Sequence, residues 1–82
     1  MKISYIVQSF SEEMRLGKPT LVANTPRQVN TKAEAISRAQ RDAERFAGVI
    51  ALSQEYDDES NEFGRMEVLL QAGTVPEGIL GD

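Results

Sequence analysis

The chain has 82 residues, of which 40% are hydrophobic and 27% are charged, and its formal net charge is −4. This size leaves room for one folded domain without a second core, and the composition is typical of a soluble globular protein. The acidic charge weighs against general nucleic-acid binding, which depends on a positive surface. The sequence contains no cysteine, which excludes disulfides and thiolate metal sites.

The first part of the chain predicts a hairpin of two strands. The alternating pattern ISYIVQSF at residues 3–10 predicts the first strand. The charged stretch SEEMRLGK that follows predicts a hairpin loop, with Gly17 near its end. Residues 20–25 predict the second strand, and Pro19 and Pro26 at its margins indicate an edge position. Residues 27–30 are expected to lead to the next element.

Residues 31–48 have the clearest helical pattern in the chain. Thr31 and Glu34 have the spacing of a capping box, and Gly48 stands where a left-handed residue commonly ends a helix. One side of this helix is mostly alanine, and we expect it to lie against a sheet with Ile36 and Phe46 buried. The predicted apolar face contains Ala33, Ala35, Ile36, Ala39, Ala43, Phe46 and Ala47, and the opposite side contains Glu34, Arg38, Arg41, Asp42 and Arg45.

Two more strands are predicted after the helix, at residues 49–56 and 65–72, with the acidic loop 57–62 between them. The order of elements predicts an α+β fold of two layers, ββαββ. In it, a four-stranded antiparallel sheet with strand order 2-1-3-4 carries the helix on one face. We expect a single domain over residues 1–73 and an irregular C-terminal tail over residues 74–82.

The sequence offers little for catalysis or metal binding. Histidine and cysteine are both absent, which removes the usual general base at neutral pH and the commonest zinc ligands. The carboxylates that lie together, in the loop 57–62, belong to a predicted hairpin tip rather than to the buried setting that catalytic pairs need. This loop also lacks the glycine and glutamate that a calcium loop places at positions six and twelve. We therefore expect no enzymatic activity, no metal site and no cofactor.

Three arginines are candidates for binding a partner. Arg38, Arg41 and Arg45 stand on one side of the helix at spacings of three and four, where guanidinium groups can hold phosphates or carboxylates. Glu34 and Asp42 are interleaved with them, as on an ordinary solvent-exposed face. Both interpretations stay open at this point.

The apolar residues of the strands and the tail predict self-association. One helix covers one face of a four-stranded sheet, yet the strands carry apolar residues on both faces. We expect a homodimer built on the face away from the helix. The tail residues Val75, Ile79 and Leu80 would cover part of that face, or, as the alternative, close it within one subunit.

The sequence predicts a cytoplasmic protein that contacts itself or another protein. The N-terminus lacks the uninterrupted apolar segment of a signal peptide, and no run approaches the ~18 apolar residues of a membrane-spanning helix. No membrane partner is expected, and nucleic acid is disfavoured as a partner. The rival hypothesis is a regulator or antitoxin that binds a toxin or DNA, and a carboxylate-based enzyme is the least favoured.

Two segments carry a resemblance to known proteins. GVIALSQEYD at 48–57 and EVLLQAGTVP at 67–76 resemble short conserved-hypothetical proteins of alphaproteobacterial type. Those proteins place a basic alanine-rich helix before a G-V-hydrophobic-A-aromatic-S strand and end near G-x-V-P, although Leu52 stands at the aromatic position here. The resemblance covers residues 31–76 and implies a small stand-alone bacterial domain without naming a site residue.

The hairpin followed by an amphipathic helix is also similar to antitoxins of the HicB type. In this chain VANTPRQVN stands in place of the glycine-aspartate-proline segment that this family has before its helix. That resemblance implies a toxin or DNA as the partner.

Overall fold

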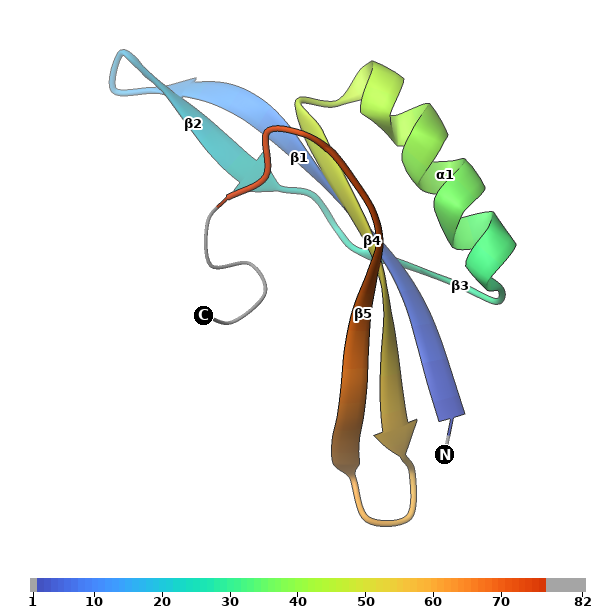
Figure 1. Ribbon diagram of the computed structural model, residues 1–82. Helices are drawn as coiled ribbons and strands as arrows, with labels where there is room; N and C mark the ends of the chain where they lie inside the picture. Colours follow the sequence, from blue (N-terminus) through green and yellow to red (C-terminus); the bar gives the residue numbers. More distant parts are fainter. Residues whose placement is uncertain (1, 77–82) are drawn as a thin grey trace.

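The computed structural model describes residues 2–76, which form one helix and a five-stranded antiparallel sheet (Figure 1). The helix lies across one face of the sheet, which confirms the α+β class. The elements are β1 (Lys2–Arg15), β2 (Lys18–Ala23), β3 (Arg27–Val29), α1 (Lys32–Arg45), β4 (Gly48–Asp57) and β5 (Glu62–Gly73). Within residues 2–76 the helix lacks the length and the apolar character needed to span a bilayer.

Strand β1 is the centre of the sheet. The hydrogen-bonded order is β2-β1-β4-β5, and β3 pairs with β1 beside this path. One edge of β1 pairs with β4 over residues 2–10, while its other edge is shared by β3 and β2 in turn. The four-stranded description from the sequence therefore differs in detail. Residues 27–29, expected to be a connection, form an additional strand because they pair with Tyr5, Ile6 and Val7.

The first hairpin has a much tighter turn than the charged sequence predicts. Residues 11–15 continue β1 and pair with β2, so that Arg15 lies opposite Lys18. The turn consists of Leu16 and Gly17, whose φ angles of 52° and 77° are both left-handed. Two such residues in succession match the type I′ turn, whose twist suits paired strands.

This turn can be tested by changing Leu16. A leucine is strained in the left-handed region, which asparagine adopts more readily. The Leu16 side chain is fully exposed, so replacing it removes no packing contacts. We expect Leu16→Asn to raise the free energy of unfolding by about 1 kcal/mol, seen as a higher urea midpoint. A lower midpoint would contradict the turn type.

Helix α1 begins as predicted but ends differently. The Thr31 hydroxyl accepts a hydrogen bond of 3.1 Å from the Glu34 amide, which caps the first turn. At the other end Phe46 is the C-cap in an extended conformation, and Gly48 already belongs to β4. Gly48 is therefore not a helix cap. A side chain there would overlap the carbonyl oxygen of Thr74, so glycine is required by the close approach of the chain after β5.

The core between helix and sheet is built on two alanines. Ala35 and Ala39 are fully buried and form one cluster with Val7 of β1 and with Val49 and Ala51 of β4. Alanine has no side chain beyond Cβ, so the helix backbone lies close to the pleated surface.

The helix is rotated relative to the predicted face. Ala33 and Ala43 are exposed, Ile36 and Phe46 are only half-buried, and Asp42 is buried at 8% exposure. The expectations that Ile36 and Phe46 are buried and that Asp42 faces solvent were therefore wrong. The stripe that faces the sheet runs through residues 35, 39 and 42, at the helical spacing of four and three.

A pair of identical substitutions tests this rotation. Ala39→Leu inserts three carbon atoms into a fully packed contact and should lower the free energy of unfolding by about 1–3 kcal/mol. Ala43→Leu makes the same change on the exposed side and should alter stability by about 0.5 kcal/mol or less. Denaturant midpoints provide the measurement. Equal losses for the two variants would be inconsistent with the described face.

The face of the sheet away from α1 has its own buried residues. Phe10 is 1% exposed and Ile50 is fully buried, and strand alternation places both opposite to the Val7, Val49 and Ala51 side. Phe10 pairs with Gly48 on one side and with Ala23 on the other. Because these neighbours are small, they leave room for its ring.

Candidate functional site

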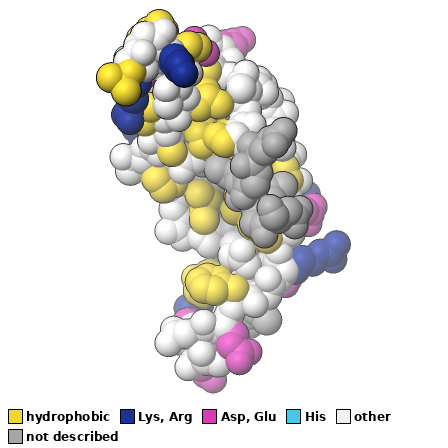
Figure 2. Space-filling view, turned by 90° about the vertical axis from the view of Figure 1, so that its left-hand side faces the viewer, with side chains coloured by type: hydrophobic (Ala, Val, Ile, Leu, Met, Phe, Trp, Pro, Cys, Tyr) yellow, Lys and Arg dark blue, Asp and Glu magenta, His cyan; other side chains and the backbone are white. Residues whose placement is uncertain are grey.

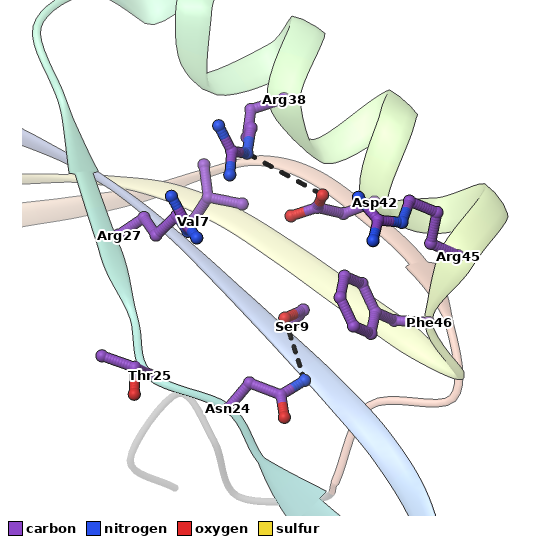
Figure 3. Close-up of a pocket in the computed structure, with 9 residues that line it drawn as sticks. All are labelled: Val7, Ser9, Asn24, Thr25, Arg27, Arg38, Asp42, Arg45 and Phe46. Atoms are coloured by element: carbon purple, nitrogen blue, oxygen red, sulfur yellow. Dashed lines mark hydrogen bonds and ion pairs between the residues drawn. The ribbon is translucent and has the colours of Figure 1, made fainter.

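A cleft of about 330 Å³ lies between the C-terminal half of α1 and the segment that links β2 to β3 (Figure 3). Side chains from the helix form one wall, side chains from the link and β3 form the other, and β1 provides the floor. The lining residues are Arg38, Asp42, Arg45 and Phe46 on the helix side, Asn24, Thr25 and Arg27 on the opposite side, and Val7 and Ser9 on the floor.

The wall opposite the helix is fixed to β1 by Asn24. Its amide nitrogen Nδ2 donates to Ser9 Oγ at 3.1 Å and to Ser11 Oγ at 3.0 Å. Its backbone amide donates to the Ser9 carbonyl at 3.0 Å, and its own carbonyl accepts from Gln8 Nε2. These bonds hold the chain where it leaves β2 and direct it into β3, which begins with Arg27.

The helix wall contains a half-buried ion pair. Arg38 Nε lies 3.8 Å from Asp42 Oδ1, with side-chain exposures of 34% and 11%. Figure 3 shows the two side chains turned toward each other above the cleft. Arg45 lies one turn further on, with its guanidinium carbon 5.6 Å from the centroid of the Phe46 ring. The Phe46 side chain points from the helix end toward Ser9 (Figure 3).

The cleft is positive on an otherwise acidic protein. Three arginines and one aspartate among the lining residues give a formal charge of +2, whereas the whole chain carries −4. A concave site with an excess of one sign concentrates the electrostatic field and attracts the opposite charge. This arrangement favours an anionic ligand.

The three arginines that the sequence grouped together line one hollow on the helix surface, but only two of them line the cleft. Arg38 and Arg45 line the cleft, whereas Arg41 is exposed on the helix outside it. Arg27 contributes the third guanidinium and was missed, because it belongs to a different element and lies opposite Val7 only through strand pairing. No signal in the helical spacing could have identified it.

The tail residues named from the sequence are only partly described. Val75 is half-buried beyond the end of β5. Ile79 and Leu80 lie outside the described residues. The structure therefore does not show what these two side chains contact.

The acidic loop forms an ordinary hairpin tip. Asp57 Oδ1 accepts a hydrogen bond from the Glu59 amide at 3.0 Å, and the Asp57 carbonyl accepts from the Asn61 amide at 2.8 Å. The neighbouring Asp58 is paired with Lys2 at 2.7 Å between Oδ2 and Nζ. Within residues 2–76, no three carboxylates lie together in a way that could hold a metal ion.

Comparison with protein-family models, with curated proteins and with solved structures found no match to this chain. The two resemblances noted in the sequence thus stay predictions. The function has to be inferred from the geometry of the fold and the cleft.

The wall formed by Asn24 can be tested by removing its side chain. Asn24→Ala removes the amide partner of two serine hydroxyls, and Ser9 is buried. We expect a loss of about 1–2 kcal/mol in the free energy of unfolding. Gln28→Ala is the matched control, since the exposed Gln28 amide also donates to a serine, Ser4, and should cost about 0.5 kcal/mol or less. Thermal or urea denaturation measures both, and equal effects would show that Asn24 does not fix the wall.

Proposed function

We propose that this protein is a small cytoplasmic binding module that acts by contacting other protein chains rather than by catalysis. Its first partner is a second copy of itself, and the contact uses the sheet face turned away from α1. The observation that carries this proposal is the set of apolar side chains that this face leaves exposed.

The central part of this face is uncharged. Within residues 6–10 of β1, 50–54 of β4 and 66–71 of β5, strand pairing and alternation place nine side chains on it, six of them apolar and three of them glutamine. These are Ile6, Gln8, Phe10, Ile50, Leu52, Gln54, Met66, Val68 and Gln71. Depletion of charge is the compositional mark of the buried centre of a protein–protein interface.

Three exposed large apolar residues lie on β5. Met66 and Val68 are 39% and 36% exposed, and Phe63, further toward the hairpin tip, is 77% exposed. Figure 2 shows hydrophobic side chains distributed along this side of the molecule, viewed from the side opposite the helix. Exposed apolar side chains gathered on one face of a small protein are typical of an interaction site.

A second copy is the partner that this chemistry favours. Two chains that each carry −4 repel one another, so a stable self-contact has to exclude like charges from its centre. The uncharged face meets this condition when a two-fold axis brings it against itself. The gain in burial also matters because an 82-residue chain buries only about 60% of the surface that it exposes when unfolded.

The oligomeric state tests this proposal directly. Light scattering at micromolar concentration should give about twice the mass of the 9.1 kDa chain. Val68→Glu should reduce the mass to that of one chain, because it places a charge at the centre of the contact. Ala43→Glu is the control, since it adds the same charge on the exposed side of the helix and should leave the dimer intact. A mass near 9.1 kDa for the unmodified chain that does not change on dilution would rule the dimer out.

A further inference from the structure

We propose that the cleft between α1 and the β2–β3 link binds a small organic phosphate monoester. This site is distinct from the sheet face assigned to self-association, since its walls are on the helix side of the sheet. Binding in the cleft therefore does not depend on the dimer.

The directions of the three guanidinium groups favour phosphate over carboxylate. Arg38 and Arg45 lie two turns apart on the helix side, and Arg27 comes from the facing wall (Figure 3). A planar carboxylate is satisfied by one arginine through two parallel hydrogen bonds. A tetrahedral phosphate presents three oxygens in different directions, which suits donors that converge from two walls.

The charge of the cleft matches that of a phosphate monoester. The monoester carries about −1.5 to −2 at neutral pH, and the lining residues carry a formal charge of +2. Asp42 holds Arg38 in place for such a ligand, because its carboxylate lies within 3.8 Å of Arg38 Nε. Arg27 and Arg45 are exposed at the mouth, where a ligand can reach them.

The remaining lining residues suit the organic part of such a ligand. The floor contains the apolar Val7 side chain, and the Phe46 ring lies at the end of the helix wall. The hydroxyl of Thr25 stands on the opposite wall and can act as a donor or an acceptor. A volume of about 330 Å³ lies at the lower end of the range for small-molecule sites.

Calorimetric titration of the full chain, in a low-salt buffer without phosphate, tests the site with defined probes. Phenyl phosphate should bind saturably, and inorganic phosphate should bind more weakly because it lacks the apolar part. Benzoate, which has the same ring and a carboxylate, should bind at least about tenfold more weakly than phenyl phosphate. Absence of saturable phenyl phosphate binding at millimolar concentration, or equal affinity for benzoate, would overturn the proposal.

Substitutions locate the binding. Arg27→Ala and Arg45→Ala should each weaken phenyl phosphate binding about tenfold or more, because each removes charge-assisted hydrogen bonds. Arg65→Ala is the matched control, an exposed arginine of β5 outside the cleft, and should change the affinity less than about twofold. An equal loss in all three variants would show general charge attraction and would reject the site.

Two further measurements separate phosphate binding in the cleft from dimerisation and from nucleic-acid binding. Val68→Glu should bind phenyl phosphate like the unmodified chain, whether or not the chain dimerises, and a loss of binding in this variant would place the ligand on the sheet face. A 20-base-pair DNA duplex should not displace phenyl phosphate at physiological salt, because the acidic chain repels the DNA backbone. Displacement that requires Arg27 and Arg45 would overturn the small-ligand assignment in favour of a nucleic-acid site.

Discussion

The close contact of two alanines with the sheet is the constraint on which the rest of this structure depends. Ala35 and Ala39 are fully buried and cluster with Val7, Val49 and Ala51, so the first half of α1 lies close to the strands. The next residue of the same stripe, Asp42, is larger and charged. The alanine contact sets the position of the helix, and the change in side-chain type along its stripe leaves a cleft beside its second half.

The two surfaces assigned to binding follow from the same arrangement. Because α1 covers one face of the sheet, apolar side chains of the other face stay exposed, and the proposed dimer would bury them. Because β2 and β3 share one edge of β1, the link between them faces the helix and completes the cleft. One surface has an uncharged and mostly apolar centre, and the other is polar and positive, so they suit chemically different ligands.

The sequence predicted the elements whose local pattern agrees with their surroundings. The helix and its Thr31 cap, the α+β class and the edge character of β2 were all readable from periodicity, capping residues and proline positions. The length of β1 could not be predicted from the sequence. Glu12, Glu13 and Arg15 resemble a loop, and only their pairing with β2 makes them part of the strand. The three-residue strand β3 exists only through its pairing with β1, which has no local signal.

The candidate cleft was predicted only in part, because local patterns do not contain the pairing between distant segments. Helical spacing brought Arg38 and Arg45 together, but it also included Arg41, which lies outside the cleft. The prediction that Asp42 faces solvent was wrong because the helix has more apolar residues than the few that contact the sheet. A helical wheel weights Ala33 and Ala43 equally with Ala35 and Ala39, although the first two are exposed. Arg27 depends on tertiary register, which no pattern within one segment contains.

The topology of β1 also determines how the molecule assembles. The β1–β2 and β4–β5 pairs are local hairpins, whereas the pairing of Phe10 with Gly48 closes a loop that includes β2, β3 and the entire helix. Docking of β1 on β4 is therefore the step with the largest loop-closure entropy, and such non-local strand pairing slows folding. The cleft needs this step, since its floor is on β1 and Phe46 lies two residues before the start of β4. A ligand that binds in the cleft therefore stabilises the pairing of β1 with β4, which is the contact with the largest entropic cost of formation.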